Sequence, residues 1–484
     1  MKATRKTPPI DDCPALEVSA DGRGMTGRAG LGLLARTANR VGLTKALSDA
    51  VGGCRSWRDH DPGKVVRDLV LTLADGGDAL RHLKVLDGQA ELFGSVASAS
   101  TANRTMVALG DDELVVERLA DARRATRQRV WDAGGAPPVV AAAHAAHAAQ
   151  DTLSGENDEN GRDWRLYMDA DATLIACQCD DRDGRRQAAP TFKKGFGTHP
   201  LMVYLDRGDG SGESLAGLLR PGNAGSNTAD DHIEVFEMAL AALPELPAKV
   251  ELVVRTDTAG CTYKFLHYLR QAKVGFSVGF EINEKVRTAI RSLPDDAWVQ
   301  ARRQNGQPRE GAAVAEITHL LDLSGYPEGS RVIVRREPLH PGAQQTLFDV
   351  DGKRLTAFLT DQPDTDLAGR DSCHREHAHV EDRIRGAKDT GARNLPCETF
   401  ERNAVWLQLV MLAQDLMVWT QALTFDGRLR LAEPATLRYQ VLHAPARIVR
   451  SGRRLKLKIQ HDWPWAAQLV AAFQRLDALP LPAT

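Results

Sequence analysis

Arg165-Leu-Tyr-Met-Asp-Ala-Asp-Ala-Thr-Leu-Ile175 sets the architecture expected for this chain. Apolar or small side chains occupy its even-numbered positions, and Tyr167, Asp169, Asp171 and Thr173 occupy the odd-numbered ones. Alternation with a period of two predicts a β-strand with distinct faces. Two carboxylates therefore stand on the same face of the predicted strand.

The residues that follow predict an α/β unit around this strand. Further strands are expected at 201–205, 252–254 and 274–280, with a helix at 262–272 between the last two. Asp257 comes just past the end of the buried strand at 252–254. Because open α/β sheets place their active sites at the carboxyl ends of strands, Asp257 is a candidate site residue.

A third candidate carboxylate is Glu381, on a predicted helix among basic residues. His374, His377, Glu381, Arg385 and Lys388 are spaced by three or four residues, which predicts that they share one helix face. An exposed helix with ordinary ion pairs between Glu381 and its cations explains the same spacing. A zinc site of His374, His377 and Glu381 is a further alternative, although the order of a HExxH motif is absent.

Three carboxylates from distant parts of the chain suit metal-assisted phosphodiester chemistry. Oxygen ligands are those that Mg²⁺ prefers, and a pair of such ions can activate an attacking oxygen and stabilise a leaving one. We find no convincing serine or cysteine triad, and neither GxxxxGK[ST] nor GxGxxG occurs. ATP or dinucleotide use is therefore not expected.

The chain is expected to have a helical N-terminal region, a divided core, an insertion and a basic C-terminal region. Residues 1–150 are predicted to bind DNA, with helices at 62–74, 79–86, 100–109 and 139–150 and a glycine turn at Gly42. That turn fits a helix-turn-helix or an ordinary helical bundle. The core is predicted at 163–281 and 370–425, a β-rich insertion at 282–369 with a hairpin turn at Asp351-Gly352, and the basic region at 426–484.

Composition favours a cytoplasmic protein. Its candidate phosphate-binding feature is a local basic patch and not its overall charge. The net charge of the 484 residues is −2, which argues mildly against nucleic acid. Residues 436–465 nevertheless contain seven Lys and Arg against Asp462 alone, so phosphate contacts or a solvated basic face are both open. The seven cysteines form no CxxC pair, and no run approaches the ~20 apolar residues of a membrane span.

Several longer strings make a resemblance specific. They are His60-Asp-Pro-Gly63, Leu73-Ala-Asp-Gly-Gly77, Glu91-Leu-Phe-Gly94, Leu219-Arg-Pro-Gly-Asn-Ala-Gly-Ser-Asn227, Val254-Arg-Thr-Asp257 and Lys388-Asp-Thr-Gly391. With the three acidic patches, they resemble the DDE transposases of bacterial insertion sequences, group 1. The closest resemblance is to the insertion-sequence thirteen-eighty family, and it runs over nearly the whole chain.

The resemblance implies an RNase H-like mixed-sheet core that cuts and joins DNA strands with Mg²⁺ or Mn²⁺, two ions being expected. It makes Asp171, Asp257 and Glu381 the catalytic, metal-binding acids, with Asp169 a competing metal ligand on the same strand face. It also implies double-stranded DNA as the partner, with a homodimer on that DNA. A non-catalytic DNA-binding derivative and a stand-alone Mg²⁺ nuclease are the alternatives.

Around the last acid the chain departs from related transposases, in which Tyr and Arg precede the Glu. His374 stands for that Tyr and His377 for that Arg, and a histidine binds phosphate less reliably than an arginine. The residues predicted to contact DNA are Lys388, Arg385, His377, Arg447, Arg450, Arg453 and Arg454.

Overall fold

A nine-stranded sheet forms the centre of the computed structural model, which describes residues 19–54, 59–148, 164–191, 195–225, 228–339, 353–452 and 454–480. Its strand order is β6-β5-β2-β7-β8-β12-β11-β10-β9. The strands are β2 (Arg165–Ala172), β5 (Leu201–Asp206), β6 (Gly212–Leu218), β7 (Glu251–Thr256), β8 (Gly275–Phe280), β9 (Val299–Arg302), β10 (Pro308–Glu316), β11 (Arg331–Pro338) and β12 (Lys353–Thr360).

The first five strands confirm the predicted RNase H-like class. β5 pairs antiparallel with both β6 and β2, whereas β2, β7 and β8 run parallel to one another. The strand predicted at 165–175 is β2, and its alternation is real because Leu166, Met168 and Ala170 are all buried. β6 was not predicted, because its two glycines and its Glu and Ser obscure the apolar pattern.

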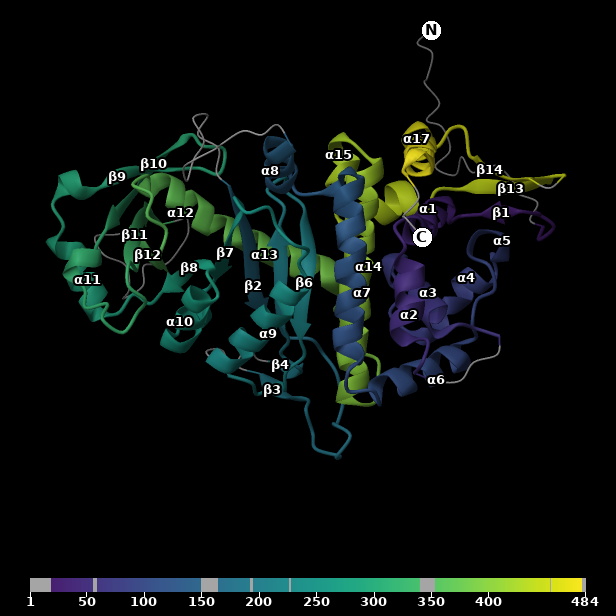
Figure 1. The fold of residues 1–484 in the computed structure, drawn as a ribbon, viewed down its shortest axis with the longest axis horizontal. Coiled ribbons are helices and arrows are strands. Elements are labelled where there is room, and N and C mark those ends of the chain that lie inside the picture. The colour runs from purple at the N-terminus through teal and green to yellow at the C-terminus, as the bar shows by residue number, and fades with distance from the viewer. Residues whose placement is uncertain are drawn as a thin grey trace, which may run out of the picture.

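The inserted region is rich in strands, as expected, but it does not form a separate sheet. β12 pairs antiparallel with β8, and β11, β10 and β9 follow outward from it. The insertion therefore widens the core sheet, as Figure 1 shows at its left. The predicted turn at Asp351-Gly352 lies outside the described residues.

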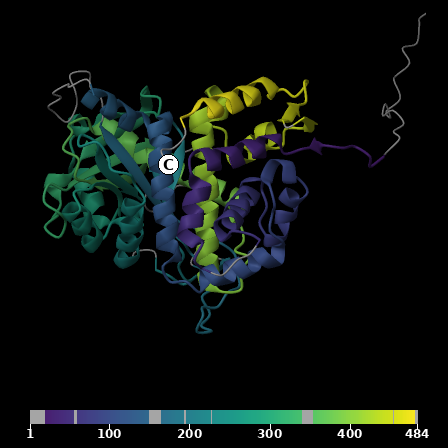
Figure 2. The same ribbon diagram turned by 45° about the vertical axis from the view of Figure 1, so that its right-hand side comes forward.

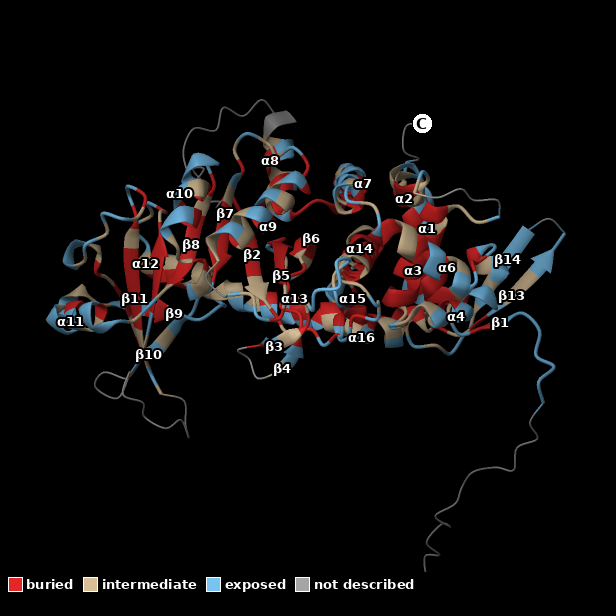
Figure 3. Ribbon diagram, turned by 90° about the horizontal axis from the view of Figure 1, so that it is seen from below, coloured by how far each residue is buried: buried red, intermediate tan, exposed pale blue. Residues whose placement is uncertain are grey.

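Helices cover both faces of the sheet. α9 (Ala229–Ala241) and α10 (Tyr263–Gln271) lie on one face, and α12 (Leu367–Arg375) and α13 (His379–Ala387) cross the other (Figure 3). A 3₁₀ turn at Glu376–Ala378 separates α12 from α13. The remaining helix of the insertion, α11 (Glu284–Ser292), precedes β9.

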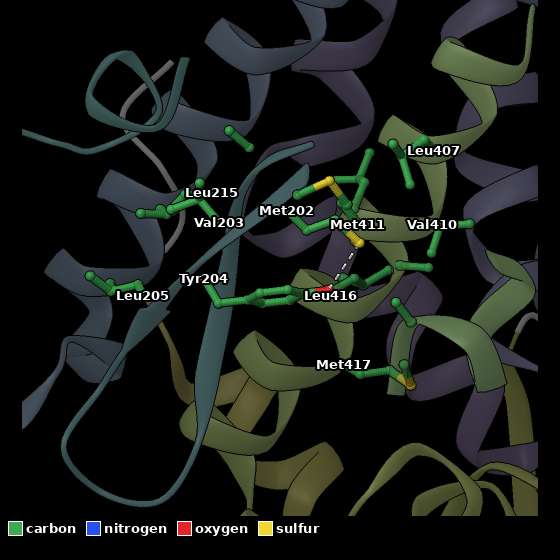
Figure 4. Packing of buried hydrophobic residues seen from close by; sticks show 14 of the residues in the cluster. Met202, Val203, Tyr204, Leu205, Leu215, Leu407, Val410, Met411, Leu416 and Met417 are labelled. Carbon is green, nitrogen blue, oxygen red and sulfur yellow. Dashed lines mark hydrogen bonds between the residues drawn. The ribbon is translucent and has the colours of Figure 1, made fainter. Parts of the chain in front are cut away.

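Helix α14 (Phe400–Thr424) lies between the sheet and the N-terminal helices (Figure 2). It is buried along nearly its whole length, including the charged Asp415, so its residues do not divide into an apolar and a solvent-facing side. Leu407, Val410 and Met411 of α14 pack against Met202 and Tyr204 of β5 in one continuous core (Figure 4).

The N-terminal region is helical, as expected, and it packs on the core. Its helices are α1 (Ala29–Arg40), α2 (Leu43–Val51), α3 (Pro62–Ala74), α4 (Lys84–Asp87), α5 (Ala90–Phe93), α6 (Ala99–Gly110), α7 (Val115–Val130) and α8 (Pro138–Ala148). Gly42, with φ of +74°, forms the predicted turn between α1 and α2.

Buried ion pairs join α7 to the sheet and to α14. Arg127 lies 2.7 Å from Glu213 of β6 and 3.0 Å from Asp415 of α14, and Arg123 lies 2.9 Å from Asp415. All four side chains are almost completely buried. Since an unpaired buried charge is costly, this network holds the three elements together.

The C-terminal region contains a hairpin that sequence patterning reveals only in part. β13 (Ala446–Ser451) pairs with β14 (Arg454–Ile459), and the short β1 (Met25–Thr26) adds to β13. α15 (Gly427–Arg430) and α16 (Pro434–Leu437) precede the hairpin and α17 (Ala466–Ala478) follows it. A small hairpin of β3 (Ala189–Thr191) and β4 (Gly195–Gly197) stands apart from the large sheet.

Candidate active site

Asp171 lies near the end of β2, and Asp257 comes directly after β7, the parallel neighbour of β2. In the pairing of β2 with β7, Asp169 lies opposite Arg255 and Ala170 lies opposite Thr256. Asp171 and Asp257 are the next residues along the two segments. Adjacent strands lie about 4.8 Å apart. Asp257 is exposed and caps a short 3₁₀ turn by accepting a hydrogen bond from the Ala259 amide at 2.9 Å. The two candidate acids therefore lie at the carboxyl ends of neighbouring central strands.

Asp169 has a different environment, although it shares its strand face with Asp171. Its carboxylate is fully buried between two guanidinium groups, at 2.7 Å from Arg255 and 2.8 Å from Arg383. The His377 ring nitrogen Nδ1 lies 3.3 Å from Asp169 Oδ1. Both oxygens therefore have cationic or hydrogen-bonding partners inside the protein.

These partners change the protonation behaviour of the buried groups. Burial alone would raise the pKa of Asp169, but the charge of Arg255 and the hydrogen bonds from His377 and Arg255 outweigh burial and lower the pKa. Burial, with His377 and Arg255 nearby, lowers the pKa of His374 to about 3. Asp169 is therefore an ionised structural group, and His374 is a neutral ring.

Glu381 lies on α13, whose buried stripe consists of Val380, Ile384 and Ala387. Arg383 reaches from one flank of this stripe towards the β5–β6 turn, 3.3 Å from Asp206. Glu381 is two residues earlier, about 200° round the helix at 3.6 residues per turn. Helix geometry thus directs Glu381 to the other flank, away from the β5–β6 turn.

The position of Asp206, next to the β5–β6 turn, shows which end of the sheet each flank of α13 faces. Asp206 pairs with Tyr167 near the start of β2, whereas Asp171 pairs with Met202 near its end. The flank of Glu381 is therefore on the side of Asp171 and Asp257. Glu381 is exposed, and its carboxylate has no ion pair or hydrogen bond within the described part of the chain.

The chain matches the family described as "Transposase DDE domain group 1" over residues 9–481. The chain belongs to the DDE transposases. No curated protein matches it. Membership of the narrower insertion-sequence thirteen-eighty family stays a prediction.

The donor chemistry of the transposase fits a divalent metal, but the site is not fully assembled. Asp171, Asp257 and Glu381 offer carboxylate oxygens, the ligands of Mg²⁺ and Mn²⁺. Among the described residues, no group of three or more His, Cys, Asp or Glu side chains is gathered to hold a metal ion. The two aspartates lie together, and Glu381 stands on the helix that crosses beside them.

The contacts of His374 and Asp169 correct two expectations. The alternative zinc site of His374, His377 and Glu381 is not formed, because His374 donates to or accepts from Ser277 at 2.9 Å and stacks on Phe358. Asp169 is not placed as a metal ligand, because Arg255 and Arg383 occupy its oxygens.

The predicted single helix face is also wrong, because the 3₁₀ turn at Glu376–Ala378 interrupts it. His377 lies inside the protein on Asp169, with only 15% of its side chain exposed, so it does not present a surface for phosphate. Arg385 is exposed but lies 2.8 Å from Asp382 and 3.1 Å from Glu433. Lys388 begins the segment after α13 and is half-buried.

Most residues predicted to bind DNA in the C-terminal region share the β13–β14 hairpin. Arg447, Arg450 and Arg454 are exposed, and Arg453 lies outside the described residues. Arg447 pairs across the strands with Lys458, and Ser451 pairs with Arg454. One hairpin face therefore carries Arg447, Arg454, Lys456 and Lys458, while Arg450 lies on the other.

Arg255 and Arg383 are site residues that the sequence analysis missed. Arg255 is fully buried and also contacts Asp206 at 2.7 Å, the Cys373 carbonyl oxygen at 2.7 Å and the Tyr167 ring. Its position inside the apolar strand 252–256, directly before a candidate acid, was the available signal. A charged residue in a buried strand requires a buried counter-charge, and Asp169 on the next strand supplies it.

Proposed function

We propose that this transposase cleaves DNA at the ends of a mobile element and joins those ends to target DNA, using divalent metal ions held by Asp171, Asp257 and Glu381. The observation that carries the proposal is the placement of Asp171 and Asp257 side by side at the ends of parallel strands. Membership of the DDE family supports the reaction class. Mg²⁺ or Mn²⁺, when bound, would supply Lewis acidity and an activated oxygen nucleophile.

The surrounding residues of the chain position these acids. Arg255 and Arg383 neutralise Asp169, so that a buried ion cluster anchors α13 on β2. Asp171 and Asp257 hold their carboxylates at adjacent strand ends, and Glu381 approaches from α13. The basic face of the β13–β14 hairpin and Lys388 would hold the phosphates that flank the cut, where their charges displace counterions.

A cleavage assay tests the proposal. Duplexes carrying the DNA that borders the gene on each side are incubated with the protein and Mg²⁺ or Mn²⁺. Asp171→Asn, Asp257→Asn and Glu381→Gln should each abolish cutting but retain binding. Asp382→Asn is a matched control, because Asp382 is an exposed carboxylate on the same helix, and it should cut normally.

Two outcomes separate the alternatives. Joining of a cut 3′-hydroxyl end to a second duplex distinguishes a transposase from a nuclease that only hydrolyses. Specific binding with no cutting by the wild type under either metal would favour a non-catalytic DNA-binding protein. Cutting by all three variants would refute the assignment of the acids.

A further inference from the structure

Three aromatic side chains form a cluster beside the β13–β14 hairpin. Tyr439 belongs to the segment Arg438–Leu442, and Trp463 and Trp465 lie in the turn between β14 and α17. Their ring centroids are 6.3 Å apart for Tyr439 and Trp463, 5.8 Å for Tyr439 and Trp465, and 5.6 Å for the two tryptophans. All three pairs meet edge to face, the geometry that aromatic quadrupoles favour.

The cluster is held in place because Trp463 and Trp465 pack against the hydrophobic core, whereas Tyr439 stands clear of it. Trp463 donates a hydrogen bond from Nε1 to the Gln440 carbonyl oxygen at 2.9 Å, which ties the turn to the segment that carries Tyr439. Tyr439 is 64% exposed, and both tryptophans are partly exposed. A rigid aromatic surface open to solvent is unfavourable unless something covers it, so it marks a binding site more readily than a structural contact.

Positive charge borders the cluster on the hairpin side. Arg447 and Lys458 face each other at the end of the hairpin from which the chain continues to Trp463, and both are exposed. Where the structure describes the chain, no carboxylate lies within ion-pair distance of either residue. Asp462 directly precedes Trp463, and His461 lies 2.9 Å from it.

On its other side, the cluster connects to the segment that follows α13, the helix that carries Glu381. Arg438, adjacent to Tyr439, donates hydrogen bonds to the Asp389 carbonyl oxygen at 2.6 Å and to the Thr390 hydroxyl at 3.2 Å. Asp389 directly follows Lys388. The segment that carries Tyr439 is thus bonded to the residues that follow the helix of Glu381, and the basic hairpin adjoins the two tryptophans along the chain.

We propose that this cluster, Tyr439 with Trp463 and Trp465, is a stacking site for unpaired DNA bases, an inference that rests on the proposed DNA-processing function. Every base has a π-face, so aromatic rings bind bases with little sequence preference, while adjacent cations hold the backbone phosphates. In an intact duplex the base faces are already stacked on one another. The site therefore selects DNA with unpaired or splayed bases over paired duplex.

Binding measurements in EDTA test this inference apart from cleavage. The probes are a fluorescein-labelled forked duplex with unpaired thymidine arms and a fully paired duplex of the same length. Tyr439→Ala should weaken binding of the forked duplex by about tenfold, a typical effect of losing one stacked base. Binding of the paired duplex should change little, and Tyr439→Phe should behave as the wild type because it keeps the ring.

Leu431→Ala is the matched control, since Leu431 is also a large, exposed apolar residue, and it should affect neither probe. Trp465→Phe should bind the forked duplex normally and Trp465→Ala should not. An equal loss on both probes, no loss on either, or the same loss from Phe and Ala at position 439 would overturn the inference. Selective loss without any strand cleavage in Mg²⁺ would instead refute the proposed function alone.

Discussion

Asp169→Asn and Asp171→Asn should have opposite effects on stability and activity, although the two residues are one pleat apart on the same strand. Asp169 is fully buried and neutralises Arg255 and Arg383. Removing one partner of a buried ion pair leaves an uncompensated charge and costs about 3–5 kcal/mol. At roughly 2–4 °C per kcal/mol for a large domain, the melting temperature should fall by on the order of 10 °C.

Asp171→Asn should change the melting temperature much less but should remove cleavage, because Asp171 is only half-buried at the strand end whereas Asp169 is fully buried. Calorimetry and a strand-cleavage assay on both purified variants measure the two effects, with cleavage by Asp169→Asn assayed below its own melting temperature. Two results would refute this reasoning: an Asp169→Asn protein as stable as the wild type, or an Asp171→Asn protein that cuts DNA.

Three further predictions concern pH, the hairpin and Lys388. Because the pKa of Asp169 is lowered well below its ordinary value of 3.8, its contribution to stability is present above that pH, begins to be lost below it and disappears as pH falls through the folded-state pKa. Urea unfolding between pH 7 and 3 should show the onset of this loss in the wild type and less of it in Asp169→Asn. Reversing the charges of Arg447 and Lys458 should weaken binding to all duplexes alike and lower the salt slope by about 0.9 per lost contact, and an unchanged slope would mean that the basic face does not touch phosphate. Lys388→Ala should slow cleavage and joining without removing metal binding, and Lys388→Arg should partly restore the rate; cutting at the wild-type rate by Lys388→Ala would assign the lysine a structural role only.

Local patterning predicted the core strands and most helices, because each element satisfies its own periodicity. The helix at 62–74 begins at a proline and is capped by Asp61, so its bounds follow from local chemistry. β6, β9 and β10 were missed, because their stability comes from neighbouring strands and not from a clear apolar alternation. The joining of the insertion to β8 was equally hidden, since strand pairing across the sheet depends on distant residues.

The candidate site was predicted where the signal was local. Asp257 follows a buried strand, and Asp171 lies on an alternating one, so both could be assigned to strand ends. The alternating pattern assigned Asp169 to the same strand face as Asp171, so it could not reveal that Asp169 is buried in an ion cluster. Its burial depends on Arg383 and His377, which reach it from more than 200 positions away. The break at Glu376–Ala378 likewise has no clear local signal, because no proline or glycine marks it.

The pairing of β1 with β13 has a consequence for biosynthesis. Thr26 pairs with Ala446, 420 positions later in the chain. At translation rates of about 5–20 residues per second, the first strand waits roughly 20–80 s for its partner to leave the ribosome. Helices α1 and α3 wait almost as long for α14, against which they are buried. The small sheet that displays the basic hairpin can therefore close only when synthesis is nearly finished, so a nascent transposase acquires this basic surface as one of its last features.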